Sequence, residues 1–323
     1  MSNDTAPPLA AKRPRIATIG FASRDRLLKV QRFPSPGVQE VVLEEVTAAG
    51  GTSTNTAVAV ARFGARAAIA AAIGDDEEGA TIRRVLTAAG VDTSWLIARA
   101  GGRSSRATII VSDEPLERTI LWHEGAELRH GDRLDIPGLF DQDVLVLDVG
   151  DVQLRRWLLD LPAHTQPRAR LLGTLSYLAD PDLPDALDLV LRHDAVVGNE
   201  ADFLAITGTW TLSDAESAIQ SRMRGANLRV AIVTSGPAGC RIVTEDLRLR
   251  LPAYVVPVVD PTGAGDAFVA GVAYGMALRW EWDRIGRFAN AAGGLAVRAL
   301  GAQSGLPTLA EVERLLATGS VQP

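Results

Sequence analysis

With 323 residues, of which 47% are hydrophobic, the chain is long enough to form the core of one large α/β domain or of two ordinary ones. Its net charge of −6 argues against a basic nucleic-acid-binding surface and favours small substrates. Its only lysines are Lys12 and Lys29, which excludes a Walker-type phosphate loop and the strand lysine of protein kinases.

The amino-terminal segment and the single cysteine indicate where the protein works. Residues 1–14 are polar and rich in proline and lack the apolar run of a signal peptide, so we expect a disordered tail. No stretch approaches 18 uninterrupted apolar residues, so we expect no membrane span. Cys240 cannot form an internal disulfide, which favours a reducing compartment and predicts a cytoplasmic protein.

The first predicted strand, residues 15–20, is followed by an aspartate. Because ligands gather beyond the carboxyl ends of strands in open α/β sheets, Asp25 is placed to bind a polar substrate, although a solvated loop aspartate fits equally well. Residues 27–46 predict two further strands joined by a turn at 34–37.

A glycine pair precedes the first predicted helix, residues 56–63. Gly50 and Gly51 let a ligand approach the backbone, and Asn55 can both donate to and accept from a hydroxyl. A plain turn is the alternative interpretation of the glycines. We then expect the following elements: a strand at 66–73, a helix at 80–89, and a hairpin of strands 106–111 and 118–122.

Strands and helices alternate regularly in the second half of the chain. The predicted strands are 144–147, 170–175, 195–197 and 229–234, and the predicted helices are 151–160, 182–192, a short helix ending near 208, 213–224, 265–279, 283–299 and 308–317. This alternation is typical of a parallel sheet covered on both faces. The segments at 27–46 and 106–122 interrupt this alternation with about four strands that look antiparallel, which predicts a small separate sheet.

The segment from Asp260 to Phe268 carries the strongest chemical indication. An apolar run at 255–259 predicts a buried strand before it, and the small-residue helix follows it. Gly263 and Gly265 allow an anion to reach the free amides at a helix start. Asp266 is out of place beside phosphate unless it accepts a proton from an attacking hydroxyl. A tight turn with Asp266 as a helix cap is the alternative.

Two segments together resemble a known family. Residues 260–268 resemble the carboxyl-terminal motif of the ribokinase-like (PfkB) carbohydrate kinases, and Gly50-Gly51 with Asn55 and the Gly74–Gly79 loop resemble its amino-terminal motif. The resemblance implies a three-layer α/β/α fold with a mainly parallel central sheet and a small β-sheet lid from 27–46 and 106–122. It also implies a single kinase domain over residues 15–317 and a homodimer formed through the lid.

The resemblance implies ATP and Mg²⁺ as cofactors, a sugar substrate, and roles for individual residues. Asp266 is then the catalytic base, and the amides of Gly263, Ala264 and Gly265 form the anion hole. The substrate-binding positions are Asp25, Gly51, Thr52, Asn55 and Arg118. The nucleotide positions are Asn199, Ser235, Gly236, Gly239 and Asn290. The cation positions are Asp202 for Mg²⁺, through water, and Asp260 and Gly301 for a monovalent cation such as K⁺.

This sequence departs from the family pattern at several positions, and Thr52 and Ser53 replace the Lys-Gly that is common among ribokinases. Asp202 stands where the family has glutamate, Pro261 where threonine is usual, and Gly305 where some relatives place a cation-binding serine, which puts K⁺ dependence in question.

The sequence does not determine which molecule accepts the phosphoryl group. Ser104-Ser105 and Arg118 resemble fructose kinases of the ketohexokinase type, although Arg118 also fits a solvated hairpin arginine. A nucleoside or sugar-phosphate kinase of the same family, or a sugar-binding protein without catalysis, are the alternatives. Arg24, Arg103 and Arg106 would suit a phosphorylated sugar.

Overall fold

The computed structural model describes residues 13–129, 131–148, 169–175 and 186–321. Most of the predicted tail and the predicted helix at 151–160 lie outside these ranges. Within them, none of the helices has the length and apolar character needed to cross a bilayer.

The elements follow the predicted alternation closely. The strands are β1 (Arg15–Ile19), β2 (Ser23–Val30), β3 (Val42–Gly50), β4 (Arg66–Gly74), β5 (Asp92–Arg99), β6 (Ser105–Asp113), β7 (Leu116–His123), β8 (Val144–Asp148), β9 (Arg170–Thr174), β10 (Ala195–Asn199), β11 (Val230–Thr234), β12 (Cys240–Thr244) and β13 (Arg248–Leu251). The helices are α1 (Thr52–Arg62), α2 (Glu77–Ala88), α3 (Ile136–Phe140), α5 (Ala186–Val190), α6 (Glu200–Thr207), α7 (Leu212–Met223), α8 (Ala264–Ala277), α9 (Trp282–Ala296) and α10 (Leu309–Thr318).

Nine strands form the main sheet in the order β13-β12-β11-β10-β9-β8-β1-β4-β5. The pairs from β5 to β11 are parallel, and β12 and β13 add an antiparallel edge. Parallel neighbours require crossover connections, which the intervening helices supply. The carboxyl ends of the parallel strands therefore meet at one edge, where α/β sheets bind ligands.

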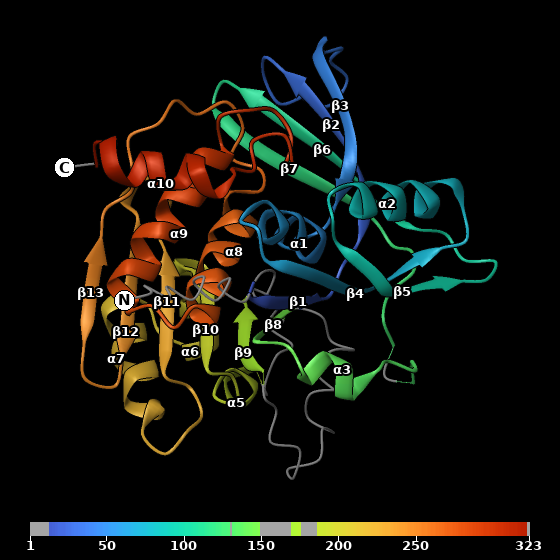
Figure 1. Cartoon of the computed structure of the whole chain (residues 1–323). Helices are drawn as coiled ribbons and strands as arrows, with labels where there is room; N and C mark the ends of the chain where they lie inside the picture. The colour runs from blue at the N-terminus through green and yellow to red at the C-terminus, as the bar shows by residue number, and fades with distance from the viewer. Residues whose placement is uncertain (1–12, 130, 149–168, 176–185, 322–323) are drawn as a thin grey trace, which may run out of the picture.

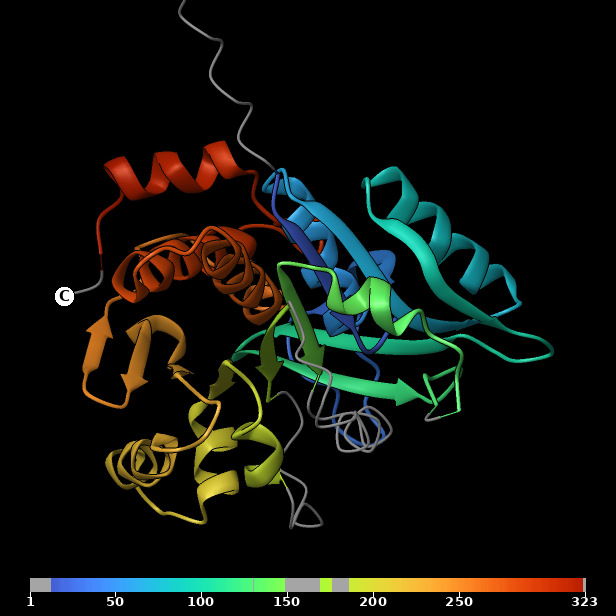
Figure 2. The same ribbon diagram turned by 60° about the horizontal axis from the view of Figure 1, so that its bottom comes forward.

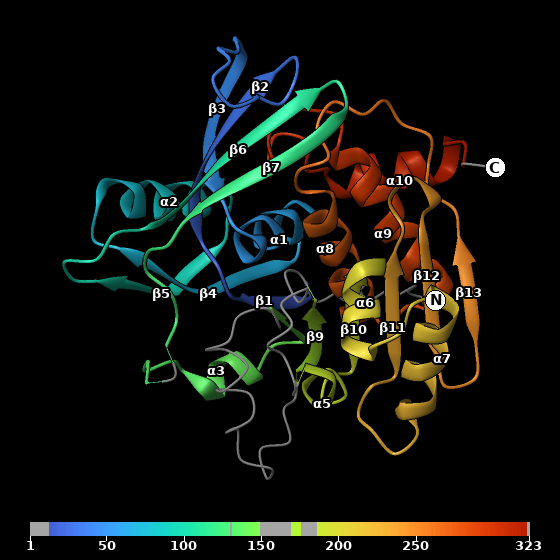
Figure 3. The ribbon, with the colours of Figure 1, turned by 180° about the vertical axis from the view of Figure 1, so that it is seen from behind.

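Each face of this sheet is covered by its own group of helices. Helices α1, α8 and α9 pack on one face, as Figure 1 shows, and α6 and α7 cover the other, which is seen from behind in Figure 3. Neighbouring strand residues point to opposite faces, so Ile16 belongs to the first core and Ala17 to the second. Figure 2 shows the same layers from below. The predicted three-layer α/β/α fold is confirmed.

The four lid strands form a separate sheet in the order β3-β2-β6-β7. The sequence suggested antiparallel strands throughout, but the central pair β2 and β6 is parallel, and only the outer pairs are antiparallel. The inner face of the lid buries Leu27, Ile109 and Val111 against Leu300. The lid is thereby packed onto the loops at the carboxyl edge of the main sheet.

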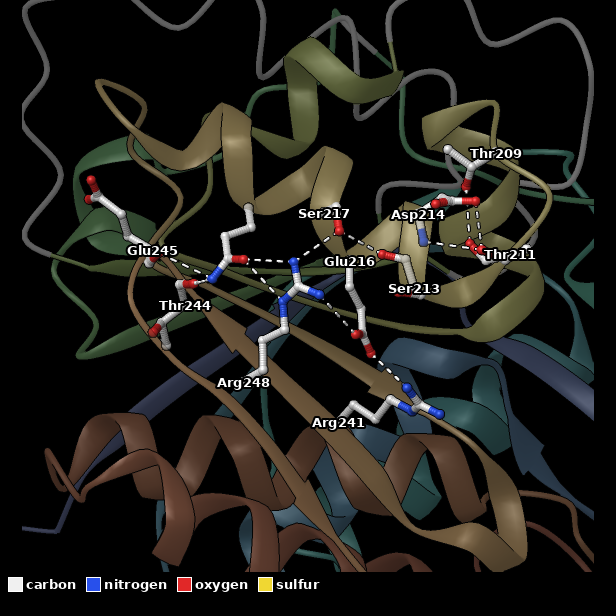
Figure 4. A network of polar contacts seen from close by, with 11 residues as sticks. Thr209, Thr211, Ser213, Asp214, Glu216, Ser217, Arg241, Thr244, Glu245 and Arg248 are labelled. Atoms are coloured by element: carbon white, nitrogen blue, oxygen red, sulfur yellow. Dashed lines mark hydrogen bonds and ion pairs between the residues drawn. The ribbon is translucent and has the colours of Figure 1, made fainter.

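A polar network holds the antiparallel edge strands to helix α7. Figure 4 shows the Glu216 carboxylate between Arg241 of β12, at 3.0 Å, and Arg248 of β13, at 3.6 Å. Glu216 is buried, so its charge needs these partners. Gln220 adds a bond of 2.7 Å from its side-chain nitrogen to the carbonyl of Thr244. These contacts fix the strand β12 that follows the predicted nucleotide turn.

The prediction of a strand at residues 255–259 is wrong. The segment is extended but joins neither sheet, and Val255 and Val258 are half exposed. Pro252 and Pro257 lack the amide hydrogens that a ladder needs, and the only pairing in this segment is an isolated bridge between Tyr254 and Val321. The segment therefore connects β13 to α8 without adding a strand.

Candidate active site

Helix α8 begins at a glycine in the left-handed region. Gly263 is the N-cap with φ 85°, and a Cβ there would lie 2.5 Å from the carbonyl oxygen of Ala302. The fully buried Asp260 carboxylate holds this turn, because it accepts from the amides of Thr262 (2.9 Å) and Gly301 (2.8 Å). These bonds give Asp260 a structural role, and the cation predicted at Asp260 and Gly301 stays a prediction.

The start of α8 presents free amides. Within the described ranges, the amides of Gly263, Gly265 and Asp266 donate to no acceptor, whereas the amide of Ala264 donates to the Pro261 carbonyl at 3.3 Å. A Cβ on Gly265 would meet no atom within 4 Å, so the space outside it is open. Free amides and the positive end of the helix dipole together favour a bound anion.

Asp266 lies in the first turn of α8 and is partly buried beside these amides. The Asn55 side-chain nitrogen donates to its Oδ2 at 2.7 Å. Burial raises the pKa of Asp266 to about 6, the hydrogen bond from Asn55 and the charge of Arg118 lower it, and the charge of Asp25 raises it. Asp266 is therefore ionised at neutral pH and close to the range in which it can take a proton.

Asp25 lies inside β2, not in the loop that the sequence suggested. Its side chain is buried on the inner face of the lid, and the Ser23 hydroxyl donates to its Oδ1 at 2.6 Å. Burial raises its pKa to about 6, while Ser23 and the charge of Arg24 lower it. A Cβ on Gly50 would lie 1.9 Å from Oδ2, so glycine at that position makes room for this carboxylate.

The remaining predicted substrate residues surround the same turn. Arg118 of β7 donates from Nη1 to the Pro261 carbonyl at 3.3 Å, so the lid reaches the α8 turn directly. Thr52 donates to Asp148 at the end of β8 at 2.8 Å. Gly51 has φ 92°, and a Cβ there would lie 2.7 Å from the Phe21 carbonyl oxygen.

The predicted nucleotide positions lie farther along the sheet edge. Gly236 and Gly239 both have positive φ in the turn after β11, and the Ser235 hydroxyl donates to the exposed Glu200 at 2.6 Å. Asn290 is buried on α9, where its side-chain nitrogen donates to the carbonyls of Leu251 (3.0 Å) and Pro252 (3.1 Å).

Asn199 and Asp202 cap the start of helix α6. The Asp202 amide donates to Oδ1 of Asn199 at 3.0 Å, and the Asn199 amide donates to Oδ2 of Asp202 at 2.8 Å. Burial raises the pKa of Asp202 to about 6, opposed by the bond from the Asn199 amide. In the part of the chain that the structure describes, no group of three or more metal-binding side chains gathers.

The comparison with protein-family models gives a match to the pfkB family carbohydrate kinases over residues 13–309. The chain belongs to this family. Its ribokinase-like fold places the free amides, Asp266 and Asn55 under the lid at the carboxyl edge of the sheet.

Two curated proteins are similar to the chain over most of its length, and a solved structure shares its fold. The chain is 27% identical to a ribokinase of Bacillus subtilis over 312 residues, covering 93% of this chain and 99% of the relative. It is 29% identical to fructokinase-1 of Oryza sativa subsp. japonica over 314 residues, covering 87% and 93%. The solved Arabidopsis thaliana ribokinase, complexed with ribose and ATP, superimposes with a TM-score of 0.78 at 21% identity, covering 95% and 99%.

The structure adds residues to this carbohydrate kinase site that the sequence did not assign. Gln303 donates from Nε2 to Oδ1 of Asn55 at 3.1 Å, and Asp148, Ser23 and Glu200 contact predicted site residues as described above. Gln303 lies two residues after the predicted cation position Gly301, but nothing local in the sequence indicates its partner. Asn55 and Gln303 are separated by 248 positions in the sequence.

Proposed function

We propose that the protein transfers the γ-phosphoryl group of ATP to a hydroxymethyl hydroxyl of a sugar such as ribose or fructose. The observation that carries the proposal is one carboxylate, Asp266, held by Asn55 beside the free amides of Gly263 and Gly265. A base beside an anion-binding helix start is what attack by a hydroxyl on a phosphoryl group needs. The similarity to a ribokinase and a fructokinase supports a sugar as acceptor.

Asp266 and the amides at the start of α8 have different roles in the proposed transfer. Oδ2 of Asp266 is bound to Asn55, and Oδ1 has no hydrogen-bond donor in the described ranges, so Oδ1 accepts the proton of the sugar hydroxyl as its oxygen attacks the γ-phosphorus. The amides at the start of α8 stabilise negative charge on the phosphoryl oxygens, and losing one such donor typically costs about 3–4 kcal/mol of transition-state stabilisation. The bond from the γ-phosphorus to the bridging oxygen breaks, and ADP leaves.

Magnesium bound to the nucleotide supplies further neutralisation of the phosphate charge in such a reaction. The buried Asp202 and the exposed Glu200 provide hard oxygen donors at the carboxyl end of β10, which suit Mg²⁺ held through water. Asp25 is buried on the inner face of the lid, where its carboxylate can accept a hydrogen bond from a sugar hydroxyl.

A phosphorylated sugar is a weaker candidate. Arg24 and Arg106 are neighbours in the β2–β6 register, and Arg24 adjoins Asp25 in the strand. Because neighbouring side chains of a strand point to opposite faces, both arginines lie on the lid face away from Asp25. They line a separate cavity of about 420 Å³ with Glu77, Glu78 and His123.

The lid also carries exposed apolar side chains that favour a homodimer through it. These side chains are Phe33, Val41, Leu43, Leu116, Leu121 and Trp122. Exposed large apolar side chains are candidates for contact with a second subunit. We expect a dimer in sedimentation experiments at micromolar concentration, and a monomer under those conditions would contradict this assembly.

The experiment that tests the proposed function is ADP release over a panel of acceptors. The panel contains ribose, fructose, fructose 6-phosphate and adenosine with MgATP, and the control is the same panel with Asp266→Asn. We expect ADP release with ribose or fructose that exceeds the control by at least 100-fold. Release with adenosine or the sugar phosphate alone would redirect the substrate, and thermal stabilisation by a sugar without any ADP release would favour a binding protein.

A further inference from the structure

Gln303 lies behind the proposed base, outside the set of residues that contact the reacting groups. It occupies the loop between α9 and α10, and its side-chain nitrogen donates to Asn55 Oδ1 at 3.1 Å. Asn55 in turn donates from Nδ2 to Asp266 Oδ2 at 2.7 Å. The three side chains form one hydrogen-bonded chain that ends at the carboxylate.

The Asp266 carboxylate determines which groups donate and which accept along these hydrogen bonds. An ionised carboxylate only accepts hydrogen bonds, so Asn55 must turn its nitrogen toward Asp266. The Asn55 oxygen then faces Gln303, which must donate through Nε2. Gln303 therefore adds to the effect of Asp266. If the Asn55 amide reversed, oxygen would face oxygen at Asp266 and nitrogen would face nitrogen at Gln303.

The loop that carries Gln303 is tied to the α8 turn. The Gly301 amide donates to Asp260 at 2.8 Å, and Gly263 lies so near Ala302 that a Cβ on it would be 2.5 Å from the Ala302 carbonyl oxygen. Asn55 is 4% exposed, so water has little access to replace a lost partner. The position of Gln303 relative to Asp266 is thus fixed by the same contacts that shape the free amides.

We propose that Gln303 is a positioning residue, which fixes the Asn55 amide so that Asn55 holds Oδ2 of Asp266 and leaves Oδ1 for the proton of the substrate. This inference rests on the proposed function and extends it to a residue that does not touch the reacting atoms. The second hydrogen on Asn55 Nδ2 stays available for a substrate hydroxyl.

The orientation of the Asn55 amide affects how tightly Asp266 binds a proton. The hydrogen bond from Asn55 lowers the pKa of Asp266, against the effect of burial. The other charged groups that act on it are Arg118 from β7, which lowers the pKa, and Asp25 from β2, which raises it. Loss of the Asn55 orientation leaves burial and Asp25 opposed by Arg118 alone, so the pKa of Asp266 rises.

The test compares Gln303→Glu with the wild type. The new carboxylate has nearly the same shape but cannot donate to the Asn55 oxygen, so it competes with Asp266 for the Asn55 amide nitrogen, and its charge also raises the pKa of Asp266. In a ¹³C NMR titration of labelled aspartate carboxyl groups, with Asp266→Asn identifying the signal, we expect the pKa of Asp266 to rise from about 6 by at least one unit. This readout needs no turnover, so it stays informative if the proposed function fails.

Two further variants separate positioning from a general structural effect. Gln303→Met removes the donor without adding charge and is expected to give a smaller rise, and Ser304→Ala, an exposed neighbour in the same loop, is expected to give none. If the enzyme is active, a one-unit rise in the pKa of Asp266 should lower kcat/KM of Gln303→Glu about twofold at pH 7, with recovery at pH 9. An unchanged Asp266 titration in folded Gln303→Met protein, which adds no charge, would overturn the inference.

Discussion

Asp266→Asn is expected to lower kcat by about 10²–10⁴-fold, the usual contribution of a general base. The amide keeps the shape of the side chain and can still accept from Asn55, but it cannot take the proton of the sugar hydroxyl. The free amides of Gly263 and Gly265 are backbone groups and stay in place, so the dissociation constant of ATP should change by less than threefold. Single-turnover transfer from labelled ATP and calorimetric ATP binding measure the two effects.

The same variant provides its own folding control. Since the pKa of Asp266 is raised in the folded protein, the folded state binds this proton more tightly than the unfolded state does, and the charged form destabilises the fold above pH 6. Replacement by asparagine removes that cost, on the order of 1 kcal/mol for a partly exposed group. We expect Tm at pH 8 to stay equal or rise. A wild-type kcat in this variant would show that another group is the base.

Gly50→Ala and Asp25→Ala are both expected to lower kcat/KM for the sugar. A Cβ on Gly50 would lie 1.9 Å from Asp25 Oδ2, so the carboxylate must leave its position. Loss of a hydrogen bond from substrate to a charged group costs about 1.5–3 kcal/mol, which corresponds to a 10- to 150-fold fall in kcat/KM for the sugar. Steady-state kinetics with varied sugar at saturating ATP measure it.

The matched control for Gly50→Ala is Gly64→Ala. Gly64 has positive φ, 85°, which Gly50 does not, but a Cβ there would meet no atom within 4 Å, so the Gly64 variant suffers only the backbone strain. We expect kcat/KM for the sugar to stay near the wild-type value in Gly64→Ala. Equal losses in the two variants would indicate general destabilisation, and an unaffected Gly50→Ala enzyme would remove Asp25 from the sugar site.

The geometry of the α8 turn could be predicted because it is local, whereas the chemistry assigned to it stays a prediction. Gly263, Gly265 and Asp266 lie within four positions, and a helix that starts directly after Gly263 determines both the free amides and the place of the carboxylate in its first turn. The regular alternation of strands and helices likewise determines the parallel sheet, since helical crossovers leave few alternatives. The prediction of a strand at 255–259 was wrong because it was based on the apolar composition alone. Composition does not show that the prolines lack amide hydrogens or that no neighbouring strand is there to pair with.

The contacts that the sequence could not predict are long-range. Asn55 was expected to bind substrate, and its hydrogen bond to Asp266 joins residues 211 positions apart. The parallel pairing of β2 with β6 depends on how two hairpins meet in space. Asp25 was expected in a loop because its strand begins earlier than the apolar pattern does: Ser23 and Asp25 are polar residues buried on the inner face of the lid.

The central claim, that Asp266 accepts the proton of the sugar hydroxyl, is tested most directly by the pH dependence of kcat/KM for the sugar. The base must be ionised, so activity should be constant above pH 7 and fall as pH decreases through about 6, where Asp266 and Asp25 take up protons. The residual activity of Asp266→Asn should lack the component from Asp266. A wild-type profile that stays flat down to pH 5, or an unchanged acid limb in Asp266→Asn, would contradict the account.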